Sequence, residues 1–250
     1  MTIQLFELRG ADGKRIKGDR ADGIDRQILF ITGFLSKRWG NKSKALAQWC
    51  QEKGWGFCCY DVRGFGDSEG QFTDYTLSDW IADARTALKS MEAGPPVTIV
   101  GNSLGSWIAW LVAQEFAIVE ELILFAPAFN MMGERAKTIS KDRLHDWHIA
   151  GWMPWDDDPL HKDWLLSWKW VEESEQYWAK TFDHLRPIQT TILHGGQDVV
   201  ISPDGSRWFA EELLCRDPSF PLDLRLIPGD HRLSSSEHLE QFHRLVMREV

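Results

Sequence analysis

The sequence predicts an α/β protein whose mostly parallel, eight-stranded sheet is flanked by helices. Short apolar runs of strand length alternate with segments whose apolar residues recur at helical spacing, and glycine or proline marks most junctions. Strands that alternate with helices form a parallel sheet with both faces covered. The alternation lapses once, which predicts a core domain of residues 1–127 and 188–250 and a helical, tryptophan-rich cap (lid) insertion of residues 128–187.

The predicted elements begin with a hairpin around Asp12-Gly13. Before the cap they are strands 3–8, 14–18 and 27–34, helix 42–53, strand 56–62, helix 76–91, strand 97–101, a helix that begins at Leu104, and strand 121–127. Gly54 ends the first helix, and Pro95-Pro96 separates the second helix from the strand after it. After the cap come strand 190–195, helix 203–214, strand 222–229 and helix 235–248.

The composition argues against several classes of function. The chain has 37 acidic and 28 basic residues and a formal net charge of −9, and without a basic run nothing favours nucleic-acid binding. The polar N-terminal stretch has no apolar signal core, and no apolar stretch is long enough to span a bilayer. The four cysteines lack metal-ligand spacing, so we expect reduced, mostly buried thiols. The sequence predicts a cytoplasmic protein and leaves its oligomeric state open.

The stretch Gly101-Asn102-Ser103-Leu104-Gly105 matches the pattern G-x-S-x-G between a predicted strand and a predicted helix. A sharp strand-to-helix turn forces the central serine into a strained backbone conformation, and small flanking residues let strand and helix approach. The serine then lies at a helix N-terminus, whose dipole favours developing negative charge. Ser103 is therefore the candidate nucleophile; a serine that only caps the helix is the alternative.

A serine nucleophile needs a base and an acid. Asp198 follows the strand at 190–195 and His231 follows the strand at 222–229, so both belong to the edge where parallel strands present their carboxyl ends. The imidazole would take the serine proton, and the carboxylate would hold the imidazole in the required tautomer. Asp230 is a rival acid, but an immediate neighbour of the base points its side chain elsewhere. The histidines without this placement are His145, His148, His161, His184, His194, His238 and His243.

An oxyanion hole needs two backbone N–H groups aimed at one oxygen. Leu104, directly after the nucleophile, would supply the first. The turn after the strand at 27–34 would supply the second, from Phe34, with Gly33 letting the backbone turn and Leu35 as the fallback donor.

Five stretches carry a resemblance to a known family: "TGF", "YDVRGFGDSEG", "GNSLGSW", "LHGGQD" and "GDHRLS" stand in its order. The chain resembles α/β-hydrolase-fold serine hydrolases over nearly its whole length outside the cap. Within them it is similar to the acyl-protein thioesterase and acyl-glucuronide deacylase group called abhydrolase domain-containing protein 10. The resemblance implies a nucleophile at Ser103, an acid at Asp198 and a base at His231. Thr32-Gly33 stands where the family usually has histidine-glycine.

The turn at residues 61–68 recurs across this family, which implies that it fixes loop geometry near the site, with Arg63 bracing loops. Lys37 and Arg38 could meet an anionic group of a substrate, but we expect solvated surface charge. His194 is expected to pack or hydrogen-bond within its loop. Acidic residues expected to be solvated or at a helix N-terminus are Asp157, Asp158 and Asp204.

The cap holds seven of the fourteen tryptophans, namely Trp147, Trp152, Trp155, Trp164, Trp168, Trp170 and Trp178. Their apolar area predicts a covered cleft for an acyl chain or an aromatic acid, with most of them in the cap's own core and two or three lining the pocket. We predict a serine hydrolase that cleaves ester or thioester bonds of small acyl substrates through an acyl-enzyme, with no metal or cofactor. The alternatives are a non-catalytic ligand-binding protein, a C–C hydrolase or perhydrolase with the same triad, and an interaction module built on the cap.

Overall fold

The computed structural model describes residues 2–155 and 164–248. Its main sheet has eight strands in the order β1-β2-β4-β3-β5-β6-β9-β10. The pairs β1–β2 and β2–β4 are antiparallel and the other five pairs are parallel, which confirms the mostly parallel sheet. The strands are β1 (Gln4–Arg9), β2 (Arg15–Ala21), β3 (Gln27–Ile31), β4 (Gly56–Tyr60), β5 (Val97–Asn102), β6 (Val119–Phe125), β9 (Gln189–Gly195) and β10 (Leu222–Ile227).

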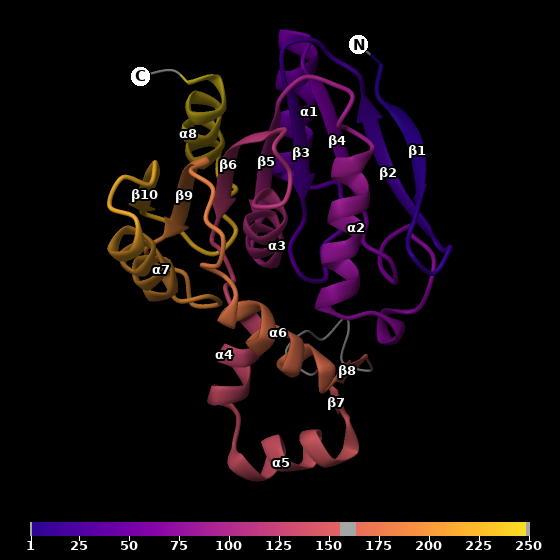
Figure 1. Cartoon of the computed structure of the whole chain (residues 1–250), viewed down its shortest axis with the longest axis vertical. Coiled ribbons are helices and arrows are strands. Elements are labelled where there is room, and N and C mark those ends of the chain that lie inside the picture. Colours follow the sequence, from indigo (N-terminus) through magenta and orange to yellow (C-terminus); the bar gives the residue numbers. More distant parts are fainter. Residues whose placement is uncertain (1, 156–163, 249–250) are drawn as a thin grey trace.

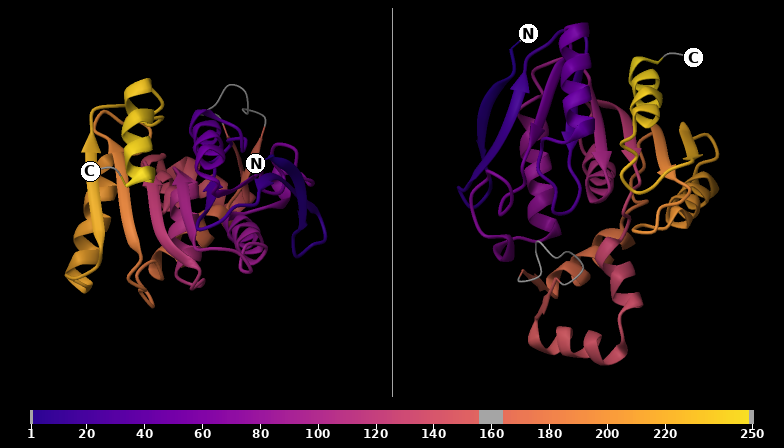
Figure 2. Two further views of the ribbon diagram at one scale, coloured as in Figure 1. Left: turned by 90° about the horizontal axis from the view of Figure 1, so that it is seen from above. Right: turned by 180° about the vertical axis from the view of Figure 1, so that it is seen from behind.

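Helices cover both faces of this sheet. Helices α1 and α8 lie together on one face, and α2, α3 and α7 lie on the other, as the view along the sheet shows (Figure 2, left). Their bounds are α1 (Asn41–Lys53), α2 (Leu77–Lys89), α3 (Leu104–Ala113), α7 (Pro203–Arg216) and α8 (Ser236–Met247), with a short 3-10 helix, η1 (Phe72–Asp74), before α2. Within the described part of the chain, no helix combines the length and apolar composition needed to cross a bilayer.

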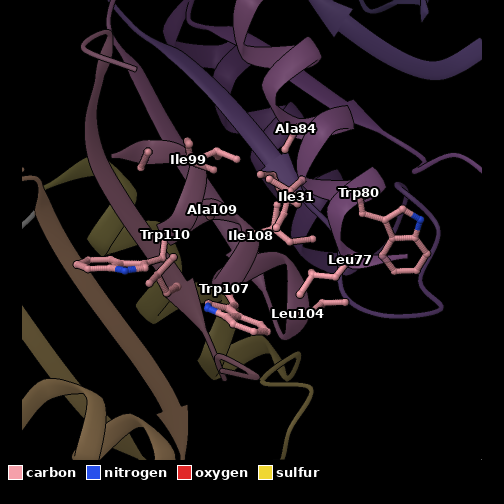
Figure 3. Close-up of a cluster of buried hydrophobic side chains, with 14 of the residues drawn as sticks. Ile31, Leu77, Trp80, Ala84, Ile99, Leu104, Trp107, Ile108, Ala109 and Trp110 are labelled. Atoms are coloured by element: carbon pink, nitrogen blue, oxygen red, sulfur yellow. The ribbon is translucent and has the colours of Figure 1, made fainter. Parts of the chain in front are cut away.

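The larger hydrophobic cluster packs between α2, α3 and the sheet, and it fixes the start of α3. Figure 3 shows Leu104, Trp107 and Trp110 of α3 in this cluster with Leu77 and Trp80 of α2. All five side chains are at most 2% exposed, which places Trp107 in the core. Burial of such large apolar side chains stabilises the helix that begins directly after Ser103.

The segment predicted as the cap lies between β6 and β9. It contains α4 (Met131–Thr138), α5 (Lys141–Ala150), β7 (Trp152–Pro154), β8 (Leu165–Ser167) and α6 (Lys169–Ala179). These elements gather beyond one end of the sheet, opposite the end where the two chain termini lie (Figure 1). The segment was predicted to be helical; besides α4, α5 and α6 it also contains β7 and β8, which pair as a two-stranded antiparallel sheet that the sequence did not predict. Asp157, Asp158 and His161 lie outside the described residues.

The strand predicted at 27–34 ends earlier, at Ile31, because the chain turns there. The hydroxyl of Thr32 donates to the carbonyl of Ser36 at 2.7 Å, and the N–H of Ser36 donates to the carbonyl of Gly33 at 3.2 Å. Leu35 has a φ of +51°. The apolar residues after Ile31 therefore form a tight turn at the carboxyl end of β3.

Candidate active site

Ser103 lies at the sharp turn between β5 and α3 and has the strained backbone that the motif predicts. Its φ is +54° and its ψ is −121°, a combination that residues with a side chain rarely adopt. The N–H of Ser103 donates to the carbonyl of Phe125 at 2.8 Å, and the N–H of Ala128 donates to the carbonyl of Ser103 at 3.2 Å. These bonds to the end of β6 and the loop after it hold the turn in place.

Close backbone contacts explain the glycines of the motif. A Cβ added to Gly105 would overlap the carbonyl oxygens of Ile31 and Thr32, at the end of β3. A Cβ added to Gly101 would overlap the backbone of Ser106. Because only a hydrogen fits at either position, α3 can begin directly beside β3 and present the serine at the edge of the sheet.

Ser103, His231 and Asp198 form one continuous hydrogen-bonded chain. The Oγ of Ser103 lies 3.1 Å from Nε2 of His231, and Nδ1 of His231 lies 2.7 Å from Oδ2 of Asp198. Because an ionised carboxylate only accepts, Nδ1 carries the proton and Nε2 can accept from the serine hydroxyl. The structure thus brings together the three side chains named from the sequence, although 128 positions separate Ser103 from His231.

The loops that carry the carboxylate and the imidazole are joined to each other. The N–H of Gly196, after β9, donates to the carbonyl of Ile227, at the end of β10, over 2.7 Å. A Cβ added to Gly195 would overlap the carbonyl oxygens of Gly229 and Asp230. This close approach of the two strand ends fixes the separation of the acid from the base.

The Asp198 carboxylate is fully buried and accepts four hydrogen bonds. Oδ1 accepts from the N–H groups of Val200 and Ile201 at 2.8 and 2.9 Å, and Oδ2 lies within hydrogen-bond distance of both His231 and His194. Burial raises the pKa of this carboxyl, but the N–H of Ile201 and the imidazole of His231 lead the groups that lower it, and the net pKa lies below its usual value. Asp198 is therefore ionised at neutral pH.

His194 hydrogen-bonds within its loop, as expected, but one of its partners is the candidate acid. Nε2 lies 3.1 Å from Oδ2 of Asp198, and Nδ1 lies 2.7 Å from Oγ of Ser206, in the first turn of α7. The ring is fully buried, and this burial lowers the pKa of His194. Sequence reasoning missed the contact with Asp198. The signal available was a histidine and an aspartate four positions apart at the end of a strand.

Asp230, the rival acid, builds the turn that carries the base. Its Oδ1 accepts from the N–H groups of Arg232 and Leu233 at 3.0 and 3.2 Å. Its carboxylate thus binds the backbone of the two residues that follow His231, as in an Asx turn. The expectation that it points away from the imidazole agrees with these bonds.

Lys42, at the start of α1, contacts the same loop and was not singled out from the sequence. Its Nζ donates to the carbonyl of Arg232 and lies 5.0 Å from the centre of the Phe125 ring. Only 7% of the residue is exposed, and this burial lowers the pKa of the ammonium to about 8. No pattern around Lys42 indicated a buried position, because its partners belong to distant loops and strands.

The turn after β3 lies directly against the serine. A Cβ added to Gly33 would come within 3.1 Å of the Cβ of Ser103. Over residues 2–155 and 164–248, the N–H groups of Phe34 and Leu104 have no hydrogen-bond partner. For Leu104 this follows from its place at the start of α3, where N–H groups have no acceptor within the helix. Both predicted oxyanion donors therefore have N–H groups available beside Ser103.

Arg38 corrects an expectation, because it is buried rather than solvated. Its guanidinium meets the carboxylates of Asp19 at 2.6 Å, Asp67 at 2.9 Å and Asp61. Burial opposes the charge of Arg38, but the carboxylates, Asp19 first, raise its pKa above the ordinary value. Lys37, the neighbour, is exposed as expected. The carboxylates come from β2 and from the loop after β4, which the local sequence around Arg38 does not reveal.

Arg63 braces loops, as the family resemblance implied. Its Nε donates to Oδ1 of Asp83 at 2.6 Å, and its Nη1 lies 2.9 Å from Oδ1 of Asp12. The side chain is 2% exposed and its guanidinium lies over the Tyr75 ring. Arg63 therefore links the β1–β2 hairpin to α2.

Aromatic side chains surround the turn after β3. The centre of the Phe34 ring lies close to the centres of four other aromatic rings. The distances are 5.2 Å to Trp155, 5.4 Å to Trp170, 5.7 Å to Trp80 and 5.8 Å to Phe72. Trp155 and Trp170 belong to the segment predicted as the cap, so these two tryptophans lie beside the turn that carries a predicted oxyanion donor. Among the described side chains, no cluster of three or more His, Cys, Asp and Glu residues could hold a metal ion.

Comparison with known proteins places the chain among hydrolases. A family model described as "Serine aminopeptidase, S33" matches residues 24–154. The chain is 35% identical over 245 residues to a mouse protein named mitochondrial palmitoyl-protein thioesterase ABHD10, covering 92% of this chain and 75% of the relative.

Two solved structures share the fold. Mouse alpha/beta hydrolase domain-containing protein 10 superposes with a TM-score of 0.85 and 22% identity, covering 98% of this chain and 97% of the other. Est1E from Butyrivibrio proteoclasticus, solved with bound ferulic acid, superposes with a TM-score of 0.78 and 21% identity, covering 97% and 96%. These superpositions confirm the predicted architecture of a mostly parallel sheet flanked by helices.

Proposed function

Since the chain belongs to the α/β-hydrolase family described as "Serine aminopeptidase, S33" and is an enzyme of that fold, we propose that it hydrolyses carboxylic esters or thioesters of small acyl groups. The reaction would proceed through an acyl-enzyme on Ser103. The observation that carries this proposal is the hydrogen-bonded chain from the Ser103 hydroxyl through His231 to the buried Asp198 carboxylate, with contacts of 3.1 and 2.7 Å.

In the proposed first step, His231 takes the hydroxyl proton while the Oγ of Ser103 attacks the carbonyl carbon. The N–H groups of Phe34 and Leu104 would stabilise the oxyanion, and the ionised Asp198 would stabilise the imidazolium. His231 then gives the proton to the leaving alcohol or thiol. In the second half, His231 deprotonates a water that attacks the acyl-enzyme, and Ser103 leaves with the proton. The buried position of Ser103, 8% exposed, supports a reaction in a site of low dielectric.

We propose that residues 128–187 act as a cap over the acyl group. Trp155 and Trp170 are the proposed lining residues, because both rings contact Phe34 beside the serine. The mouse relative is named a palmitoyl-protein thioesterase, which favours thioesters of acyl chains as the class to test first. A cytoplasmic location stays a prediction, and the relative's name, which says mitochondrial, gives it no support.

The first experiment is labelling with a fluorophosphonate probe, which reacts with activated serines. The wild type should be labelled at one site, Ser103→Ala should abolish the label, and His231→Ala should weaken it strongly. Ser106→Ala is the matched control, because its hydroxyl is fully buried and donates to the carbonyl of Phe125 at 3.0 Å. A label that survives Ser103→Ala would contradict the proposal.

The second experiment measures hydrolysis of p-nitrophenyl esters and acyl thioesters of graded chain length. We expect turnover that depends on chain length and disappears in Ser103→Ala. A response at background across the whole panel, in protein that the probe labels, would reject the acyl-hydrolase assignment. It would leave a C–C hydrolase or a perhydrolase, which would use the same three side chains.

A further inference from the structure

The acid of the candidate triad is shared by two imidazoles. Oδ2 of Asp198 lies 2.7 Å from Nδ1 of His231 and 3.1 Å from Nε2 of His194. A serine mechanism accounts for the first contact and leaves the second without a role. The two rings reach the same oxygen from different elements, because His194 is in β9 and His231 follows β10.

The neighbours of His194 determine which of its nitrogens carries the proton. Nε2 is 3.1 Å from the Asp198 carboxylate and 3.0 Å from the carbonyl of Ile201, and both of these groups only accept. Nε2 therefore carries a hydrogen and donates it. Nδ1 is 2.7 Å from the hydroxyl of Ser206, which can donate to it. The neutral ring is then fully hydrogen-bonded within the protein, as a completely buried imidazole requires.

This arrangement extends the chain of hydrogen bonds beyond the triad. It runs from the Ser206 hydroxyl to His194, from His194 to Asp198, and from Asp198 to His231 and Ser103. It also ties the acid to the first turn of α7, because Ser206 belongs to that helix. The carboxylate is thereby held on Oδ1 by two backbone N–H groups and on Oδ2 by two rings.

We infer that His194 is a positioning residue that holds the Asp198 carboxylate and sets how strongly this carboxylate supports the protonated form of the catalytic base. The inference rests on the proposed function. The N–H of His194 points its positive end at the oxygen that His231 uses, so it takes up part of the negative charge that would otherwise stabilise the imidazolium. Removing this donor should therefore make protonation of the base easier. The acid limb of the pH–rate profile, where the rate falls because the base is protonated, should then move to higher pH.

The experiment compares His194→Met with His194→Gln, whose side chains have nearly the same length. Gln can donate an amide N–H toward Asp198 and Met cannot. The readout is the rate of fluorophosphonate labelling of Ser103 as a function of pH. We expect the acid limb of His194→Met to move up by about 0.5–1 pH unit with a roughly tenfold slower rate, and His194→Gln to lie close to the wild type. The other charged or titratable groups in or against the His231 loop include Lys42, Asp230, Arg232 and His238, and all four are unchanged in both variants.

A second readout is the downfield proton resonance of the His231 Nδ1–H, measured in the unliganded protein. We expect it to move in His194→Met and to return toward its wild-type position in His194→Gln. If His194→Met does not fold, Ser206→Ala replaces it, because this change removes the donor to Nδ1 and should move the acid limb in the same direction by less.

The outcomes separate this inference from the proposed function. The positioning role would be overturned if the acid limb of the pH–rate profile and the resonance are unchanged, or are displaced equally in both His194 variants. If only the melting temperature falls, His194 is a structural brace and the positioning role is rejected. If His194→Met does not fold and Ser206→Ala leaves the acid limb unmoved, the positioning role is overturned as well. Absence of labelling in the wild type would instead reject the proposed function, while the resonance still tests the contact between the two histidines and Asp198.

Discussion

The carboxylate of Asp61 accepts a hydrogen bond from the backbone N–H of Arg38 at 2.7 Å and also binds the guanidinium of the same residue. This double contact ties the end of the turn after β3 to the loop after β4. The turn carries Phe34, whose N–H is a proposed oxyanion donor. Loop geometry at the site therefore depends on an ion pair that lies outside it.

Asp61→Asn should lower the free energy of unfolding by about 3 kcal/mol, because it removes a buried charge from a buried pair. Asp67→Asn is the matched control. Asp67 binds the same guanidinium at 2.9 Å, but its side chain is 59% exposed, so we expect a loss within about 1 kcal/mol. Urea unfolding of both variants checks this. Equal losses would show that the burial of Asp61 does not matter.

Asp198→Asn should reduce kcat by on the order of a thousandfold or more, because an amide favours the wrong tautomer of the base. Asp230→Asn should stay within a few fold of the wild type, since an Asn oxygen can accept the same two N–H groups from Arg232 and Leu233. Steady-state kinetics on the best substrate of the panel decide between them. A larger loss in Asp230→Asn would reverse the assignment of the acid.

Gly105→Ala should destabilise the protein by about 3 kcal/mol and impair labelling of Ser103, because the new Cβ meets the carbonyl oxygens of Ile31 and Thr32. Gly205→Ala in α7 is the control, since a Cβ there has no atom within 4 Å. It should stabilise the protein by about 0.5–1 kcal/mol, as alanine does in place of glycine within a helix. Thermal unfolding measured beside labelling tests both expectations, and a neutral Gly105→Ala would contradict the close approach of α3 to β3.

Lys42→Met should change the pH dependence of the free energy of unfolding in the alkaline range. Burial lowers the pKa of Lys42 to about 8 in the folded chain, against an ordinary value of 10.5. Between these values the unfolded chain holds a proton that the folded chain has lost, so the wild-type free energy of unfolding rises with pH relative to that of the variant. Urea unfolding at pH 7, 8, 9 and 10 measures the difference. If the difference in unfolding free energy between the wild type and Lys42→Met is the same at all four pH values, the site does not destabilise the ammonium.

The candidate triad could be named from the sequence because each member follows a strand in a distinctive local pattern. Ser103 lies between glycines, and Asp198 and His231 come directly after the last two strands of the sheet. The oxyanion turn was harder to delimit. Phe34 and Leu35 are apolar and follow β3 after only Thr32-Gly33, and the hydrogen bonds between Thr32, Gly33 and Ser36 that close the turn cannot be read from the sequence.

Buried polar groups were less predictable than apolar ones. Arg38 was expected in solvent. It is buried because it pairs with three carboxylates that belong to other elements, which the sequence around Arg38 does not reveal. His194 and Lys42 meet their partners only after the loops that follow β9 and β10 have folded. In the cap, β7 and β8 are three residues each, too short for the periodicity of a strand to be detected.

The order in which the polypeptide is synthesised has a consequence for when the enzyme can act. Ser103 and the two proposed oxyanion donors leave the ribosome before His231, which lies 128 positions after Ser103. Its loop also needs the neighbouring strand for its backbone bonds. Under the proposed mechanism, a nascent chain that carries Ser103 should therefore stay inert toward acylating compounds until the loop of His231 has been translated and has folded.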